Sequence, residues 1–143
     1  MAVTFVNNWK NILDKLRSVL RAEFKKVVPV YIGSEDVRNS SQYIRLEPVG
    51  SSVVDYNLIK NLKEYTVSVE YVFTSANMKK TALDNVLRVV ERTQHLINDN
   101  SSMTLADSTN AFDCKFTESS LNTDEAEGLA VSTWNWTCEH MDI

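Results

Sequence analysis

The stretch EYTVSVEYVFT, residues 64–74, carries the clearest structural pattern in this sequence of 143 residues. A period of two residues over ten positions predicts a β-strand with one buried face and one wetter face. A strand of this kind favours an antiparallel sheet over a parallel sheet that is buried on both sides. The residues expected on the buried face are Tyr65, Val67, Val69, Tyr71 and Phe73.

Two shorter strands are expected before this one, over residues 28–32 and 42–49. The first is rich in β-branched residues and the second alternates apolar and polar residues. The polar residues 34–41 between them predict a loop. Residues 51–62 contain apolar side chains without a clean period, so this segment could be the arm of a long hairpin.

Two amphipathic helices are expected, over about residues 6–26 and 78–98, because apolar residues recur there at spacings of three and four. Asn7 or Asn8 can cap the first helix, since an Asn side chain accepts hydrogen bonds from the free amides of the first turn. A turn-rich cluster of Asn, Asp and Ser ends the second helix.

The last third of the sequence predicts a β-hairpin, with strands over residues 111–121 and 128–139. Centring its turn near residues 124–125 places Phe116 close to Trp134 across the two strands. Aromatic pairs of this kind stabilise a sheet by roughly 0.2–1 kcal/mol each. The same register brings the two cysteines, Cys114 and Cys138, close together.

These elements follow the order α-β-β-β-α-β-β. Two helices with one apolar stripe each can cover one face of an antiparallel or mixed sheet, which is a two-layer α+β fold. The length fits one domain. We therefore expect a single domain over residues 1–143, with an arm at residues 51–62 that could protrude from it.

The charge of the chain is acidic and unevenly spread. The net charge of −4 argues against a sequence-independent nucleic-acid binder, which usually shows a basic stripe. Residues 10–26 carry six basic and two acidic side chains, whereas residues 113–142 carry seven acidic side chains and one Lys. These segments are either two solvated faces or a pair of surfaces through which subunits or a partner attract one another.

The sequence offers little for a catalytic, cofactor or metal site. Three glycines exclude a Gly-rich phosphate loop, and there is no CxxC motif or cluster of Cys and His. Cys138 and His140 share a strand face without a third group to orient them, so catalysis is not expected there. Both cysteines are expected to be buried and reduced. We therefore expect no enzyme activity, no cofactor and no metal.

Two further features concern the chain's surroundings. The first residues, MAVTFVNNWK, lack the charged start and apolar run of a signal peptide. No apolar stretch approaches the ~20 residues that a membrane-spanning helix needs, so no membrane partner is expected.

The order of the elements resembles the tail terminator and tail completion proteins of the necks of long-tailed bacteriophages. The resemblance lies in a long N-terminal amphipathic helix, the strands VPVYI, YIRLEP and EYTVSVEYVF, the helix LDNVLRVVERTQHLI and a final hairpin that ends in WNWTCE. It covers nearly the whole chain and brings no catalytic residue with it.

The resemblance implies a virion protein that is assembled in the host cytoplasm. Such proteins form a six-fold homo-oligomeric ring that caps the tail tube, stops its growth and offers a docking surface to a connector or stopper protein on the head side. The sheet lines a lumen through which DNA passes without specific binding. An acidic chain suits this role, because a negatively lined pore does not hold phosphates.

Several residues are candidates for these contacts. The basic helix, the arm and the acidic turn could meet a neighbouring subunit or a partner, and the wet sheet face could line the lumen. The candidate contacts are Arg17, Arg21, Val53, Val54, Tyr56, Leu58, Ile59, Asp124, Glu125 and Glu127, and the candidate lumen-facing residues are Glu47, Glu64 and Glu70.

Two other functions fit the same sequence. One is a different head-completion or connector protein of the neck with this architecture. The other is a small, non-enzymatic α+β domain that binds a ligand. Ring-shaped particles would favour the structural role, and a monomer with a closed apolar pocket would favour ligand binding.

Overall fold

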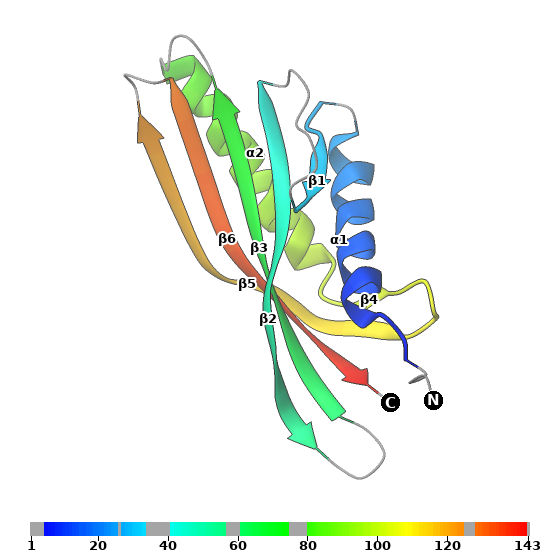
Figure 1. Ribbon diagram of the computed structural model, residues 1–143. Coiled ribbons are helices and arrows are strands. Elements are labelled where there is room, and N and C mark those ends of the chain that lie inside the picture. The colour runs from blue at the N-terminus through cyan, green and yellow to red at the C-terminus, as the bar shows by residue number, and fades with distance from the viewer. Residues whose placement is uncertain are drawn as a thin grey trace.

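The computed structural model describes residues 5–25, 27–33, 41–56, 61–74, 80–124 and 128–142. Two helices and six strands form within these residues (Figure 1). In chain order they are α1 (Asn8–Phe24), β1 (Val30–Ile32), β2 (Gln42–Tyr56), β3 (Asn61–Thr74), α2 (Lys80–Asp99), β4 (Met103–Thr104), β5 (Asn110–Asp124) and β6 (Leu129–Asp142).

The six strands make one mixed sheet in the order β1-β2-β3-β6-β5-β4. β1 runs parallel to β2, and the other neighbouring strands are antiparallel. The expected α+β fold and its order of elements are confirmed. Strand β4 is an addition to that order, because two residues are too few to show an alternating pattern.

Local chemistry sets the limits of α1. The Asn7 side chain accepts a hydrogen bond from the Lys10 amide at 3.1 Å, so Asn7 is the cap. The helix ends at Phe24 and not at residue 26. Lys25 has a φ of +53° and donates its amide to the Arg21 carbonyl at 2.7 Å, which closes the last turn.

Both helices pack on the same face of the sheet (Figure 1). Alternate residues of β3 and β6 are buried, and they share one hydrophobic cluster with residues of both helices. The alternation confirms the pattern predicted for residues 64–74 as far as Tyr71, but Val72 is buried and Phe73 is only partly buried. The fully buried residues of this cluster include Ile12, Leu16, Leu20, Val67, Val69, Val86, Trp134 and Trp136.

The segment without a clean period, residues 51–62, belongs to the hairpin of β2 and β3. β2 continues to Tyr56 and β3 begins at Asn61, and this end of the hairpin extends beyond the helices (Figure 1). The register shifts between Pro48 and Gly50 and again between Val53 and Asp55. These irregularities explain why no period is visible in the sequence there.

The hairpin of β5 and β6 is longer than predicted. β5 runs to Asp124 and β6 begins at Leu129, so the turn lies beyond the predicted centre at residues 124–125. The rings of Phe116 and Trp134 are stacked, with centroids 5.1 Å apart, as the sequence predicts. They lie diagonally rather than directly opposite each other, because bulges shift the register and place Trp136 opposite Phe116.

The core makes a matched pair of substitutions informative. Leu16 is 0% exposed in α1, whereas Leu87 is 40% exposed in α2. We expect Leu16→Ala to lower the free energy of unfolding by about 2–5 kcal/mol, since it leaves a cavity against the sheet. Leu87→Ala should cost less than about 1 kcal/mol. Urea unfolding of both variants measures the difference, and equal losses would contradict the packing of α1 on this sheet.

Candidate functional site

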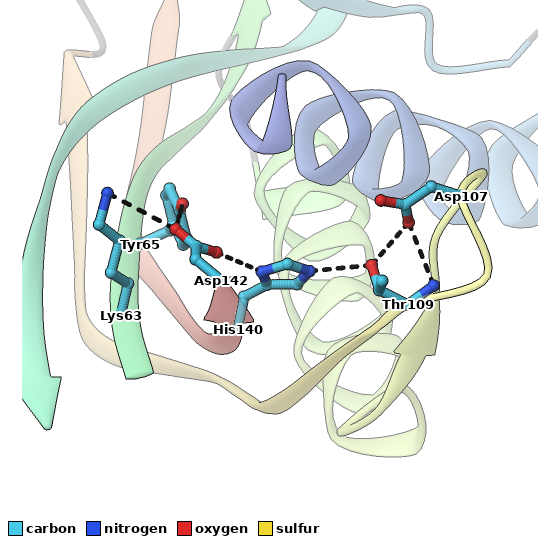
Figure 2. A network of polar contacts seen from close by, with 6 residues as sticks. All are labelled: Lys63, Tyr65, Asp107, Thr109, His140 and Asp142. Carbon is cyan, nitrogen blue, oxygen red and sulfur yellow. Dashed lines mark hydrogen bonds and ion pairs between the residues drawn. The ribbon is translucent and has the colours of Figure 1, made fainter. Parts of the chain in front are cut away.

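A chain of polar side chains connects the last residues of β6 to the first residues of β3 (Figure 2). The Asp142 carboxylate lies at its centre. Its Oδ2 accepts a hydrogen bond from the Tyr65 hydroxyl at 2.8 Å and lies 3.5 Å from the Lys63 ammonium. Its Oδ1 lies 2.5 Å from Nδ1 of His140. This carboxylate is therefore surrounded by donors, which is how a largely buried charge is compensated.

The other ring nitrogen of His140 extends the chain to the loop before β5. Nε2 lies 2.9 Å from the hydroxyl oxygen of Thr109. Thr109 in turn donates both its hydroxyl, at 2.6 Å, and its amide, at 3.1 Å, to Oδ1 of Asp107. The hydroxyl bond is the main cause that holds the pKa of the Asp107 carboxyl below its ordinary value.

Both ring nitrogens of His140 are engaged. Nε2 contacts the Thr109 hydroxyl, whose own proton is donated to Asp107, and Nδ1 contacts the Asp142 carboxylate. His140 therefore links Asp142 to the turn that holds Thr109.

The order hydroxyl, imidazole, carboxylate is also the order of a hydrolase triad. The geometry here serves a different purpose. A catalytic imidazole must take the hydroxyl proton, but the Thr109 proton is directed at Asp107 and both ring nitrogens of His140 already have partners. His140 is only 2% exposed, which leaves little access for a substrate. The arrangement can hold three segments together electrostatically.

Helix α1 contributes to the same region through an aromatic contact. The ring of Trp9 meets the ring of Tyr65 edge to face, with centroids 4.9 Å apart. The ring of His140 lies on the same tyrosine at 6.4 Å. The polar chain and the aromatic contact together attach the base of the β2–β3 hairpin to the helical layer.

The pair Cys138 and His140, considered in the sequence, is not a hydrogen-bonded pair. His140 is engaged by Asp142 and Thr109, and Cys138 lies beside Cys114 of the neighbouring strand. The nearby Cys114 thiol, followed by burial, raises the pKa of Cys138 above its ordinary value. Both cysteines are buried and free, as the sequence predicts.

The three candidate lumen-facing glutamates lie on one face of the sheet, opposite the helices. Glu64 and Glu70 alternate with the buried residues of β3, and Glu47 pairs with Ser68 on the same face. The neighbouring strand adds Glu139 directly opposite Glu64. The same face also carries Arg45, directly opposite Glu70, so a basic side chain partly offsets its glutamates.

The basic candidates of α1 have partners within the chain that the sequence did not reveal. Arg21 donates to the Val30 carbonyl of β1 at 2.8 Å, and Arg17 donates to Asp14 at 3.4 Å. Both arginines line an open hollow of about 450 Å³ on the outer side of the helix. Arg21 thereby fixes the edge strand β1 to α1, whatever else it contacts.

The candidates on the two hairpins are exposed where the structure describes them. Val53 is 54% exposed, Val54 51% and Tyr56 67%. Asp124 is exposed at the end of β5. The remaining candidates lie outside the described residues, and they are Leu58, Ile59, Glu125 and Glu127.

The polar chain was not predicted, although its two halves leave a trace in the sequence. His140-x-Asp142 places two polar groups on one face of a strand, and Asp107-x-Thr109 is typical of a side-chain-capped turn. What joins the two halves is the pairing of Ala111 with His140, which depends on the bulges of β5.

Two kinds of feature are absent from the described residues. No group of three or more His, Cys, Asp or Glu side chains in this part of the chain could hold a metal ion. Neither helix, over the residues described, is long and apolar enough to cross a membrane.

Comparison with known proteins gives a likeness in structure. No family model and no curated protein matches the sequence. The fold is similar to that of a chain in the virion of a native gene transfer agent particle, with a TM-score of 0.56 and 11% sequence identity. The likeness covers 94% of each chain. At this identity it establishes a shared fold.

The two histidines provide a test of the polar chain. His140→Gln removes two polar contacts from a buried position and should lower the free energy of unfolding by about 1–3 kcal/mol. His95→Gln is the control, because the side chain of His95 is 76% exposed on α2. Its effect should stay within about 0.5 kcal/mol. Urea unfolding near neutral pH would contradict this role of His140 if both variants behaved alike.

The buried tyrosines predict a loss of stability in alkali. Burial raises the pKa of Tyr71, and burial together with the bond to Asp142 raises that of Tyr65. A tyrosine ionises near pH 10 in the unfolded chain, so the unfolded state loses protons first and stability falls as pH rises above about 10. Tyr65→Phe should make this fall shallower, whereas Tyr56→Phe, at an exposed position, should leave its slope unchanged. Unfolding curves between pH 8 and 11 measure both slopes.

Proposed function

We propose that this chain is a structural virion protein of a phage neck, which forms a ring, terminates the tail tube and offers a docking surface to the head side. The observation that carries the proposal is the likeness in fold, over 94% of both chains, to a chain of a gene transfer agent virion. The same fold fits the family that the order of elements resembles. The sheet edges, the acidic face and the exposed hairpin support the finer parts.

A ring needs two different patches on each copy that fit one another. The sheet offers two such patches at its opposite edges. β1 pairs with β2 only as far as Leu46, and the outer edge from Glu47 to Tyr56 has no partner strand among the described residues. β4 pairs only with the first residues of β5, and the outer edge from Lys115 to Thr123 is likewise without a partner strand in the described chain.

These two edges have compatible directions. β2 and β5 run in opposite directions, because three antiparallel pairings separate them. If β5 of one copy lies beside β2 of the next, the strands are antiparallel and all copies keep one orientation. Unpaired edges of this length are templates for such pairing.

The positions of the two free edges also determine how the strands tilt relative to the ring axis. Glu47 of β2 and Glu118 of β5 lie in the same row of residues across the strands of the sheet. From this row, the free edge of β2 extends toward one end of the sheet and the free edge of β5 extends mainly toward the opposite end. A neighbouring copy must therefore be displaced along the strands to pair fully. In a closed ring this displacement tilts the strands relative to the ring axis, as in β-barrels.

The acidic sheet face suits the inside of such a ring. The helices cover one face, so the other face, with Glu47, Glu64, Glu70 and Glu139, can line the lumen. DNA would pass it without being held, since carboxylates repel phosphates. This part of the proposal gives DNA no specific site on the chain.

The outer end of the β2–β3 hairpin is the proposed contact with the tail tube protein or a head-side protein. It exposes Val53, Val54 and Tyr56 on strands that the helices do not cover. Apolar side chains gathered on a solvent-exposed strand need another surface to bury them. The alternative function, a different completion protein of the neck, would use the same features. It would differ from a tail terminator in the protein that it binds.

We propose no enzymatic role, and the ligand-binding function gains little support. Two hollows of the described residues, about 450 Å³ each, are open to solvent, one along α1 and one between the end of α1 and β1. Charged side chains line them, among them Arg17, Arg21 and Lys25. A small-molecule site is usually concave and mostly apolar.

Electron microscopy with light scattering tests the proposal. The purified protein should form rings, and these should bind tail tubes. Val54→Asp should weaken ring formation or tube binding at least tenfold, because it places a charge on the exposed hairpin. Val27→Asp is the control, since Val27 is 71% exposed before β1, away from this hairpin, and should assemble normally. A protein that stays monomeric at high concentration and binds no tube or neck partner would refute the proposal.

A further inference from the structure

The two cysteines face each other at an irregular position of the β5–β6 pair. Phe112 pairs with Glu139 and Lys115 pairs with Thr137, so Cys138 lies opposite the two residues between them. These are Asp113 and Cys114, which form a bulge. The register thus places Cys114 beside Cys138 although the regular ladder is interrupted there.

Both thiols lie on the helical side of the sheet. Cys138 belongs to the alternating buried residues of β6, and Cys114 is part of the same hydrophobic cluster. Their exposed fractions are 0% and 3%. Neighbouring strands of a sheet lie about 4.7–4.9 Å apart, and disulfides join Cα atoms that are about 4.4–6.8 Å apart, so cysteines on adjacent strands can be bridged.

We propose that Cys114 and Cys138 are a redox modification site, at which a small-molecule disulfide oxidises the two thiols to an intramolecular disulfide between β5 and β6. The inference rests on the register and on the shared buried face. It does not depend on the proposed function.

The reaction proceeds by two exchanges. The Cys114 thiol loses its proton and attacks one sulfur of the oxidant, which forms a mixed disulfide and releases one thiol. The Cys138 thiol then loses its proton and attacks the Cys114 sulfur, which releases the second thiol. Two electrons pass to the oxidant, and the protein loses two hydrogen atoms.

The structure assigns the first step to Cys114. It lies on β5, the outer strand of the pair, whereas Cys138 lies on β6 between β3 and β5. Asp113 beside it has a φ of +51°, in the left-handed region that few residues other than Gly, Asn and Asp adopt. Local opening of β5 at this bulge exposes Cys114 before Cys138.

The disulfide would strengthen the hairpin that carries one free edge of the sheet. It closes a loop from residue 114 to residue 138 and restricts the unfolded chain. Oxidation should therefore raise the melting temperature by roughly 5–10 °C. The chain would be more easily unfolded under reducing conditions than in an oxidising medium.

Mass spectrometry of the native protein tests this inference. The full chain is incubated with oxidised glutathione at pH 8.5, and free thiols are then alkylated in denaturant without reductant. We expect a mass lower by two hydrogen atoms, no alkyl group added, and a peptide pair linked between Cys114 and Cys138. Reduction should restore the original mass and melting temperature.

The variants Cys114→Ser and Cys138→Ser are the matched controls. Neither should show the rise in melting temperature on oxidation, and Cys138→Ser should retain glutathione on Cys114. In the unmodified chain, a stable glutathione adduct, a dimer linked through either cysteine, or two thiols that stay free throughout the incubation would each overturn the inference. These outcomes are measured on the chain without substitutions, so they remain decisive even if a variant folds poorly.

Discussion

The pairing of β3 with β6 is the constraint on which the rest of the structure depends. The two strands pair without a register shift from Asn61 and Asp142 at one end to Thr74 and Leu129 at the other. Alternation along both strands sends one set of side chains to the helices and the other to solvent. A slip of one residue would exchange the two sets and bury the glutamates, so the register is strongly determined.

The outer strands bend against this regular centre. The bulges all occur in the pairs β2–β3 and β5–β6, while the central pair has none. Bulges increase the local twist and re-aim side chains. They place Phe116 diagonally on Trp134, bring Cys114 beside Cys138, and bring the loop that holds Thr109 to His140. The irregular positions therefore carry the specific contacts, and the regular positions carry the core.

This division explains what the sequence could predict. The alternation of β3, the Asn7 cap and the proximity of Phe116 to Trp134 follow from local patterns, and the structure confirms them. The polar chain could not be predicted, because Thr109 meets His140 only through a loop and a shifted register. The full length of β2 was hidden by its two bulges. A period-two pattern reports a regular ladder and fails where the ladder is interrupted.

The polar chain also explains how an exposed hairpin can remain in a fixed position. Asn61 and Lys63 begin β3 at the end of the hairpin that the helices do not cover, and they pair with Asp142 and His140 of β6. Hydrophobic burial cannot anchor this end, since its β2 residues are exposed. The charged contacts of Asp142 and the edge of Trp9 on Tyr65 replace it. A contact surface carried on such a base costs less conformational entropy when it meets a partner, because the strands are already ordered.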